Sequence, residues 1–347
     1  MKALFLAGGM GTRLQPLTNT LPKPMVPIMN KPLLERTMLN LKKCGISEVV
    51  ISSCYQPEYI KHYFGNGKDL NLKIEYIVEG SPMGTGGAIK KAEEHFNESF
   101  VVFNADILSD IDLSKMIDFH KSKQALATIA VTEVQDPSMY GVVEYDTDGY
   151  VITFKEKPKP GETLSKSINA GIYIFEPSIF KEIAADQAVS VEREIFPKLL
   201  LKSQSIAAYQ SGSYWMDIGT IEKYIQTHKD IMDGKCRLVD CNFDSYNISY
   251  GKNVKIHPSS KITGPAYIGD NVIIGAKVII KHSVIGDNVS IATESRIIGS
   301  ILWNDVIISK NVRLMNTIVT SSCCVEKDIN LLNNVYDNEM AQLHKII

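Results

Sequence analysis

Residues able to bind phosphate are concentrated near the start of the chain, where an apolar run breaks into glycines and isolated cations follow. Ala3 to Ala7 predicts a buried strand, and the glycine-rich stretch Gly8 to Arg13 comes directly after it. Three glycines let the backbone turn tightly and come close to a ligand, and successive N–H groups in such a turn can hold phosphate oxygens. Arg13 adds a forked cation, and Lys23, flanked by two prolines, offers a second phosphate contact. The pattern predicts a phosphate-binding site.

Asp106 follows the apolar run Phe100 to Phe103, so we expect it at the carboxyl end of a buried strand. A carboxylate at that position suits Mg²⁺, which prefers oxygen ligands and keeps several waters. The alternative is that Asp106 caps the next helix, but Asp112 lies directly before the helical pattern and is the more natural cap. Asp217 has a similar alternative, since a helix is expected after Thr220, which is again the better-placed cap.

The stretch LAGGMGTRLQPLT (6–18), with LPKP at 21–24, resembles the signature of the sugar-1-phosphate nucleotidyltransferases, also called nucleotide-sugar pyrophosphorylases. The resemblance extends over essentially the whole chain. It implies transfer of a nucleotidyl group from a nucleoside triphosphate to a sugar 1-phosphate, with pyrophosphate as second product and Mg²⁺ as cofactor. The family's NxD position coincides with Asp106, and its WxDIG element, Trp215 to Gly219 here, makes Asp217 the second metal ligand.

A second glycine-rich stretch, Glu79 to Gly87, follows an expected strand and begins an expected helix. Small residues there would pack closely against a flat ring, and a helix N-terminus favours negative charge. The stretch resembles the family's loop that closes on the base and ribose. The nucleotide-binding residues expected are Leu6, Ala7, Gly8, Gly9, Gly11, Thr12, Arg13, Glu79, Pro82, Gly84, Thr85 and Asp106.

Glu156-Lys157-Pro158 resembles the family's sugar-phosphate element, in which a carboxylate meets sugar hydroxyls and a lysine meets the phosphate. Asn169, at the mouth of an apolar strand, offers an amide to ring hydroxyls, and Gly171 permits close approach. Glu192, further along, would stabilise the site from outside. The sugar-phosphate residues expected are Gly141, Glu156, Lys157, Asn169 and Gly171.

The implied reaction needs cations more than a base, because a sugar phosphate is already anionic at neutral pH. At ~4 Å and an effective dielectric constant of about 20, each pair of unit charges is worth ~4 kcal/mol. We expect Arg13 and the Mg²⁺ on Asp106 and Asp217 to cover the triphosphate, while Lys23 and Lys157 hold the incoming phosphate. The catalytic residues expected are Arg13, Lys23, Asp106 and Asp217.

The choice of base and sugar rests on softer features. Within the family, the elements around Glu156, Asn169 and Asp217 resemble most the bacterial mannose-1-phosphate guanylyltransferases, which implies GTP and mannose 1-phosphate as substrates of GDP-mannose synthesis. Guanine presents N1–H and N2–H₂ donors, for which Glu79 is an acceptor, unless Glu79 is only a solvated loop charge. UTP, dTTP or ATP with glucose 1-phosphate remains an alternative pair of substrates. So does a catalytically silent regulatory paralogue, although such proteins usually lose part of the catalytic set that this chain keeps.

From residue 1 to 233, strand-like and helix-like segments alternate, which predicts an α/β fold with a Rossmann-like, mostly parallel sheet flanked by helices. Ligands of such sheets lie outside the carboxyl ends of the strands, near the point where the strand order reverses. The opening glycines and Asp106 both follow strands, so we expect them at that edge. Residues 1–233 are the expected catalytic domain.

Residues 234–347 are the second expected domain, because their apolar residues follow a different period. The positions that recur every six residues include Ile256, Ile262, Ile268, Ile274 and Ile280, and later one-residue slips imply coils of seventeen residues. This predicts a left-handed parallel β-helix of roughly four coils, with Leu331 to Ile347 as a capping tail. We expect it to mediate self-association into a homo-oligomer. The alternative, an acyltransferase, would use His257 or His282 as base.

Charge and composition exclude other partners. Lysine and arginine number 37 against 39 aspartates and glutamates, so no basic surface argues for nucleic acid or anionic lipid. No apolar run approaches the length of a membrane span, and the first residues lack the pattern of a signal peptide. Six cysteines without paired CxxC spacing are expected to be reduced thiols. We therefore expect a cytoplasmic protein.

Overall fold

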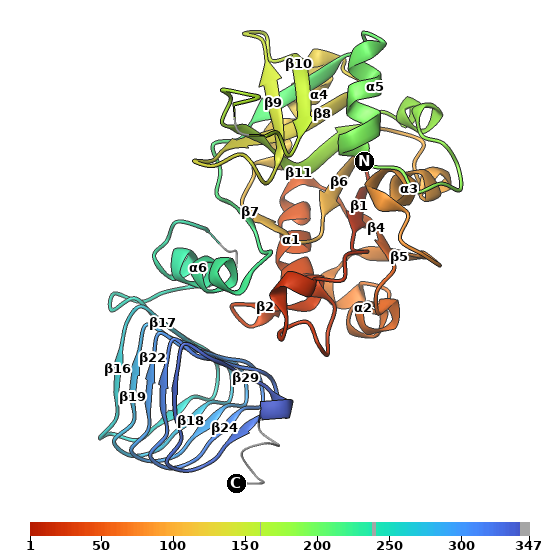
Figure 1. The fold of residues 1–347 in the computed structure, drawn as a ribbon. Coiled ribbons are helices and arrows are strands. Elements are labelled where there is room, and N and C mark those ends of the chain that lie inside the picture. Colours follow the sequence, from red (N-terminus) through yellow and green to blue (C-terminus); the bar gives the residue numbers. More distant parts are fainter. Residues whose placement is uncertain (160, 238–240, 341–347) are drawn as a thin grey trace. The chain divides into compact units, whose positions relative to one another are not determined.

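The computed structural model describes residues 1–159, 161–237 and 241–340, and the chain divides into two compact units (Figure 1). The first unit comprises Met1–Met10, Pro22–Pro24 and Thr37–Asp217. The second comprises Gly11–Leu21, Met25–Arg36 and Ile218–Ile347. The chain therefore alternates between the units within its opening signature.

The first unit is built on a nine-stranded sheet. In spatial order its strands are β10 (Val151–Glu156), β9 (Gly141–Tyr145), β11 (Ser167–Phe175), β6 (Phe100–Asn104), β1 (Ala3–Leu6), β4 (Glu48–Ser53) and β5 (Lys73–Val78), with β8 (Ala127–Glu133) beside β11 and β12 (Ile206–Gln210) beside β8. The segment β6-β1-β4-β5 is parallel, and β11 runs antiparallel to β6, β8 and β9. This confirms the α/β prediction.

The strand order reverses at β1. From β1 the chain proceeds outward through β4 to β5, and then returns to place β6 on the opposite side of β1. Ligands of open α/β sheets bind at such a point, outside the carboxyl ends of the strands. Gly8 and Gly9 follow β1 and Asp106 follows β6, so the topology brings both predicted motifs to this edge.

Helices and short strands complete this part of the chain. The α-helices are α1 (Leu33–Leu41), which passes from the second unit into the first, α2 (Pro57–Phe64), α3 (Gly84–Lys91), α4 (Leu113–Lys123) and α5 (Phe196–Leu201). The 3₁₀ turns are η1 (Thr12–Leu14), η2 (Lys23–Met25), η3 (Lys42–Cys44), η4 (Lys68–Leu70), η5 (Glu93–His95) and η6 (Pro177–Glu182), and η7 (Val191–Ile195) is a π-helical turn. The short strands are β2 (Pro27–Ile28), β3 (Lys31–Pro32), β7 (Ile107–Ser109) and β13 (Trp215–Asp217).

Both predicted helix caps are confirmed. Asp112 accepts a hydrogen bond from the Lys115 backbone at the start of α4. Thr220 does the same for Lys223 at the start of α6 (Ile221–Met232). Since these residues satisfy the helix ends, the neighbouring aspartates, Asp106 and Asp217, are left for another role.

The second unit contains the predicted β-helix, whose strands form three parallel sheets (Figure 1). The first sheet consists of β14 (Ile248–Tyr250), β17 (Ala266–Ile268), β20 (Val284–Ile285), β23 (Ile301–Leu302), β26 (Ile318–Val319) and β29 (Val335–Tyr336). The second consists of β15 (Lys255–Ile256), β18 (Ile273–Ile274), β21 (Ser290–Ile291), β24 (Ile307–Ile308) and β27 (Cys324–Val325). The third consists of β16 (Lys261–Thr263), β19 (Ile279–Lys281), β22 (Arg296–Ile298), β25 (Arg313–Met315) and β28 (Asn330–Leu332).

The register confirms the seventeen-residue coil, because Ile268 pairs with Ile285 and Ile285 pairs with Leu302. Two predictions need correction. Sheets of six, five and five strands amount to five full coils in the described part of the chain, not four. The expected capping tail is also shorter, since β28 and β29 continue the coil to Tyr336. Residues 341–347 of that tail lie outside the described residues.

One corner of the coil breaks its own pattern. Gly251, Gly269 and Gly286 occupy equivalent positions after β14, β17 and β20, where a Cβ would lie within 2.4 to 2.6 Å of an oxygen of the next coil. After β23 the same position holds Trp303, which is 4% exposed. Its indole nitrogen donates to the Tyr224 hydroxyl of α6 at 2.9 Å. The break in the glycine column therefore marks where the β-helix contacts α6.

The contact continues to the hairpin formed by β2 and β3. Tyr224 donates its hydroxyl proton to the Pro27 carbonyl at 2.8 Å, and His228 of α6 accepts from the Met29 backbone at 3.2 Å. Burial lowers the pKa of His228 to about 4, so the ring is neutral and its Nδ1–H can donate to the Tyr224 carbonyl. The β-helix, α6 and the hairpin thus form one packed body within the second unit.

Among the helices in the described ranges, none combines the length and the apolar character that crossing a bilayer demands.

Candidate active site

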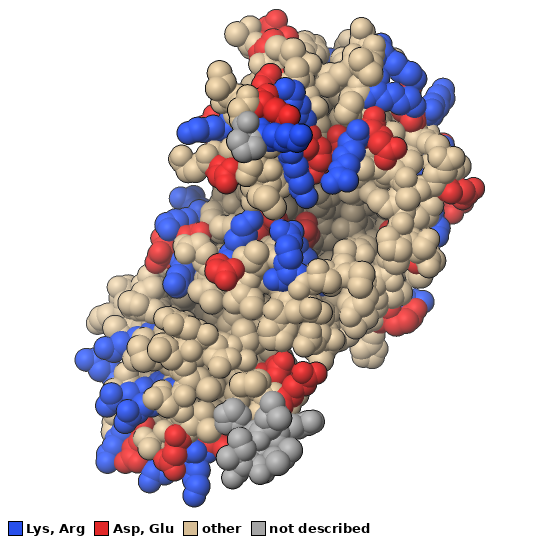
Figure 2. All heavy atoms as spheres, viewed as in Figure 1, with Lys and Arg blue, Asp and Glu red and all other residues tan. Residues whose placement is uncertain are grey.

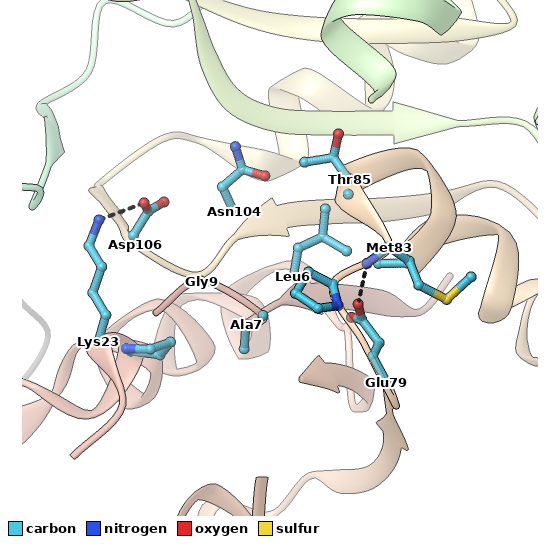
Figure 3. A pocket seen from close by; sticks show the side chains of 14 residues that line it. Leu6, Ala7, Gly9, Lys23, Glu79, Met83, Thr85, Asn104 and Asp106 are labelled. Carbon is cyan, nitrogen blue, oxygen red and sulfur yellow. Dashed lines mark hydrogen bonds and ion pairs between the residues drawn. The ribbon is translucent and has the colours of Figure 1, made fainter. Parts of the chain in front are cut away.

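A cavity of about 340 Å³ opens at the carboxyl ends of β1 and β6 (Figure 3). Figure 3 shows Lys23 and Asp106 at one end of the pocket and Glu79 with Met83 at the other. Nine residues predicted to bind nucleotide line it: Leu6, Ala7, Gly8, Gly9, Glu79, Pro82, Gly84, Thr85 and Asp106. The sequence reasoning missed four lining residues, which are Pro24, Met83, Ala88 and Asn104.

Gly11, Thr12 and Arg13, the other predicted nucleotide-binding residues, belong to the second unit. Gly11 has φ 66°, a left-handed conformation that favours glycine, and it precedes the turn η1. Arg13 is exposed. The binding roles of these three residues stay predictions.

The glycines at the start of α3 are needed for packing within the chain, and the expected contact with a flat ring stays a prediction. A Cβ on Gly84 would lie 2.5 Å from the Val189 carbonyl oxygen, and one on Gly87 would lie 2.7 Å from that of Gln187. The Gly86 backbone also donates to the Val189 carbonyl at 2.8 Å. These glycines let a distant backbone segment pack on α3, so their lack of side chains does not require a flat ring beside them.

Glu79 is a buried carboxylate in the pocket wall and not a solvated loop charge, since only 5% of it is exposed. Its Oε1 accepts from the Ser52 hydroxyl at 2.8 Å, and Oε2 accepts from the Met83 backbone at 3.4 Å. Its oxygens also lie 3.6 and 3.8 Å from where a Cβ on Gly8 would be. A buried negative charge beside the opening glycines gives this end of the pocket a preference for hydrogen-bond donors.

Lys23, Asp106 and Asp217 come together at the other end. The Lys23 ammonium lies 2.7 Å from Asp106 Oδ2 and 3.7 Å from Asp217 Oδ1, and only 6% of Lys23 is exposed. The two aspartates approach because β13 pairs with β7 and sets Asp217 opposite Ile107, the residue after Asp106. Two carboxylates 111 positions apart in the sequence therefore converge on one positive charge.

This donor set fits a divalent cation. Mg²⁺ is usually held by one or two carboxylates together with waters and substrate phosphates. Asp106 and Asp217 could provide these carboxylates, because an oxygen of each lies near the same positive charge, the Lys23 ammonium. Within the ranges that the structure describes, no three His, Cys, Asp or Glu side chains gather closely enough to hold a metal by themselves. Any metal here would therefore need oxygens from the substrate or water.

The predicted sugar-phosphate residues lie on β9, β10 and β11. Glu156, at the end of β10, pairs with Gly141, where a Cβ would lie 2.8 Å from the Glu156 carboxylate. Burial, with the charge of Glu192 second, raises the pKa of the Glu156 carboxyl, although Lys157 and Arg193 oppose the shift. Glycine is therefore needed at position 141, because a side chain there would collide with the half-buried Glu156 carboxylate.

The bulge in β11 connects this region to the nucleotide pocket. Gly171 has φ 70° in the bulge, and a Cβ there would lie 2.8 Å from the Asn104 amide nitrogen. Asn104 also lines the nucleotide pocket, and its Oδ1 is buried without a hydrogen-bond partner among the described residues. The signal for Asn104 was its place at the end of β6, two residues before Asp106. The Asn169 amide accepts from the Gly171 backbone at 2.9 Å.

Charges of both signs are mixed over the face shown in Figure 2, where Lys and Arg side chains alternate with Asp and Glu. This agrees with a formal net charge of −2. On this face the cations are interspersed with anions and form no broad basic surface.

Residues 2–234 match the family described as Nucleotidyl transferase, and residues 246–339 match the GMPPB C-terminal domain. A mannose-1-phosphate guanylyltransferase of Mycobacterium tuberculosis is 40% identical over 234 residues, which are 67% of this chain and 65% of that protein. A UTP–glucose-1-phosphate uridylyltransferase of Synechocystis sp. is 34% identical over 319 residues, or 82% of each protein. The crystal structure of HddC from Yersinia pseudotuberculosis complexed with GMP-PN is 33% identical, covers 66% of this chain and 99% of HddC, and has a TM-score of 0.57.

The chain therefore belongs to the nucleotidyl transferase family, and the protein is a nucleotidyltransferase. Substrates of the family are a nucleoside triphosphate and a sugar 1-phosphate, and its members generally use a divalent metal. This confirms the family and the class of reaction that the opening signature predicted.

Proposed function

We propose that this protein transfers the guanylyl group of GTP to mannose 1-phosphate in a Mg²⁺-dependent reaction, which forms GDP-mannose and releases pyrophosphate. The observation that carries the choice of base is the buried Glu79 carboxylate in the pocket wall. The names of two similar proteins support it, since the mycobacterial relative is a mannose-1-phosphate guanylyltransferase and HddC was solved with GMP-PN.

Glu79 has the capacity to recognise guanine. Each carboxylate oxygen has two lone pairs, and each accepts one bond from the protein, from Ser52 or from the Met83 backbone. One lone pair per oxygen is left for the N1–H and N2–H₂ donors of guanine. Uracil and thymine offer one ring N–H on the matching edge but place a carbonyl oxygen where guanine has its amino group, and adenine places a ring nitrogen where guanine has N1–H. Such unpaired contacts can reject an analogue by several orders of magnitude.

The proposed chemistry needs no general base from the chain. An oxygen of the sugar phosphate forms a bond to the α-phosphorus of GTP, while the bond from that phosphorus to the bridging oxygen of pyrophosphate breaks. No proton has to move at neutral pH. Lys23 lines the nucleotide pocket, so we propose that it neutralises triphosphate oxygens, and we leave the incoming phosphate to Lys157. Arg13 is proposed to act on the triphosphate.

Asp106 and Asp217 are the residues proposed to hold Mg²⁺. A bound Mg²⁺ would supply positive charge to the triphosphate, where charge develops on the leaving pyrophosphate. On the sugar side we propose that Glu156 and Asn169 bind hydroxyl groups of mannose. Gly141 leaves space for the Glu156 carboxylate, and Gly171 leaves space for the Asn104 amide.

The test is a matrix of GTP, UTP, dTTP and ATP against mannose 1-phosphate and glucose 1-phosphate, read by pyrophosphate release. We expect the highest kcat/KM for GTP with mannose 1-phosphate. Glu79→Gln, which has the same size but only one acceptor oxygen, should lower kcat/KM for GTP by about tenfold or more and leave the other nucleotides little changed. Glu75→Gln, on β5 four residues before Glu79 and partly exposed, is the matched control. A wild-type preference for UTP, dTTP or ATP with glucose 1-phosphate would show that the assigned substrates are wrong.

We also propose that the β-helix mediates self-association. Ile273 and Ile307 occupy equivalent positions two coils apart in one sheet, on either side of Ser290, and are 50% and 51% exposed. They place exposed apolar surface on one face of the coil. A second copy of this chain is the partner that this face would cover. Light scattering should give a multiple of the monomer mass for the wild type and a lower mass for the Ile273→Lys/Ile307→Lys variant; a monomeric wild type would contradict the proposal.

A further inference from the structure

Glu192 lies in the turn η7, and its carboxylate accepts hydrogen bonds from three hydroxyl groups. Oε2 accepts from Thr85 Oγ1 at 2.6 Å and from Ser190 Oγ at 2.8 Å, and Oε1 accepts from the Tyr173 hydroxyl at 3.0 Å. Hydrogen bonds to an ionised acceptor are roughly twice as strong as those between neutral groups. The carboxylate is therefore the common acceptor for side chains from three parts of the first unit.

Two of these hydroxyls belong to opposite sides of the candidate site. Thr85 lines the nucleotide pocket at the start of α3. Tyr173 lies on β11, the strand that carries Asn169, and is fully buried. The link on the nucleotide side is double, since the Val191 backbone also donates to Thr85 Oγ1 at 2.9 Å. One carboxylate thus connects the wall of the nucleotide pocket to the sugar-binding strand.

The direction of each hydrogen bond on the sugar side is determined. The Gly171 backbone N–H can only donate, so it is the Asn169 Oδ1 atom that faces it, at 2.9 Å. The Asn169 Nδ2 atom then donates to the Tyr173 oxygen at 2.8 Å, and the Tyr173 proton is directed to Glu192. A phenol that already accepts from Asn169 needs an acceptor for its own proton, and the Glu192 carboxylate provides it. Glu192 therefore keeps the Tyr173 oxygen available to accept from Asn169, which gives the Asn169 amide a second contact beside the Gly171 N–H.

We propose that Glu192 is a positioning residue that orients Thr85 on the nucleotide side through one oxygen and Asn169 on the sugar-phosphate side through the other. This rests on the proposed function, in which Thr85 and Asn169 contact the two substrates. Glu192 itself touches neither substrate. Its two oxygens serve different substrates, so variants that affect one oxygen should change the KM of one substrate only.

Two variants isolate the sugar side. Tyr173→Phe removes the hydroxyl between Asn169 and Glu192. Glu192→Gln has a similar effect, because its single oxygen keeps most bonds when it faces Thr85 and Ser190, and its NH₂ group then faces Tyr173. Both variants should raise KM for the sugar phosphate by about five- to tenfold, with KM for the nucleotide changed by less than about twofold. Glu192→Ala removes both connections and should raise both KM values.

The matched control is Glu194→Gln, in the same turn, where the carboxylate accepts from the Ser190 backbone at 2.9 Å. It should leave both KM values near those of the wild type. Unchanged KM values in Glu192→Gln and Tyr173→Phe, together with a lower melting temperature, would show that Glu192 only stabilises the fold. An equal rise of both KM values in Tyr173→Phe would also overturn the proposal.

These measurements use whichever nucleotide and sugar phosphate the wild type converts fastest. If that pair is not GTP and mannose 1-phosphate, the proposed substrates are wrong, but it can still be measured whether the variants raise only the KM for the sugar phosphate. If the pair is GTP and mannose 1-phosphate and the variants do not raise that KM selectively, only the proposed role of Glu192 is wrong. The two results are therefore distinguishable.

Discussion

The Tyr224 hydroxyl joins the β-helix to the hairpin that follows the Lys23 turn, and its removal gives a test of that connection. It accepts from Trp303 Nε1 at 2.9 Å and donates to the Pro27 carbonyl at 2.8 Å, and Tyr224 is fully buried. Tyr224→Phe keeps the ring and removes both bonds. It leaves one buried N–H donor and one carbonyl without this partner.

The expected cost follows from those two groups. An unsatisfied buried polar group costs ~1–3 kcal/mol, so the loss of both partners should lower the unfolding free energy by ~2–6 kcal/mol. The void beside Tyr224, Pro27 and Trp303 is about 10 Å³, at the lower limit of what a water needs, so solvent should not replace the hydroxyl. Trp303→Phe removes the donor itself, and the double variant should lose less than the sum of the two single variants.

The assay is urea unfolding followed by far-UV circular dichroism for all variants, including Trp303→Phe, and by tryptophan fluorescence for the variants that keep Trp303. The chain has two tryptophans, so a Trp215→Phe background reports on Trp303 in the second unit. The control is Tyr246→Phe, which removes a hydroxyl in the same unit from a side chain that is 78% exposed. If Tyr224→Phe costs no more than Tyr246→Phe, the connection through the hydroxyl does not stabilise the second unit. Tyr224→Phe should be read in the same Trp215→Phe background.

Three further predictions concern the coil, the metal site and the dependence on pH. Gly269→Ala should destabilise the β-helix by ~1–3 kcal/mol in urea unfolding, because its Cβ would lie 2.5 Å from an oxygen of the next coil, whereas Gly80→Ala, with open space around it, should be nearly neutral. Asp217→Asn should lower turnover by orders of magnitude with circular dichroism unchanged, and full activity of the wild type in excess chelator would contradict the metal assignment. The raised pKa of Glu156 means that its carboxylate is lost at a higher pH than an ordinary glutamate's as the solution is acidified, so kcat/KM for the sugar phosphate should fall earlier. Glu192→Gln removes a nearby negative charge and should shift that fall to lower pH, and an unshifted profile would contradict the stated cause.

Local sequence patterns were enough to predict the main elements of the fold. The apolar run before Gly8 predicted β1, and the six-residue period predicted the β-helix with its seventeen-residue coils. Both depend on side chains close in the sequence, because strand burial and coil period repeat over a few residues. The number of coils was underestimated since the last coil has a weaker apolar pattern, although Leu331 and Tyr336 are buried in it. The family followed from the opening signature, which is itself local.

The tertiary structure alone determined which distant segments of the chain contact one another. No local pattern shows that Asp217 lies beside Asp106, which requires β13 to pair with β7. The reason for Gly84 and Gly87 likewise appears only when the backbone around Val189 packs on α3. Glu192 reaches Thr85 across 107 positions, and its role depends on that contact. Sequence encodes the period and burial of each element, whereas which surfaces meet is set by the packing of all elements at once, and the candidate site lies where they meet.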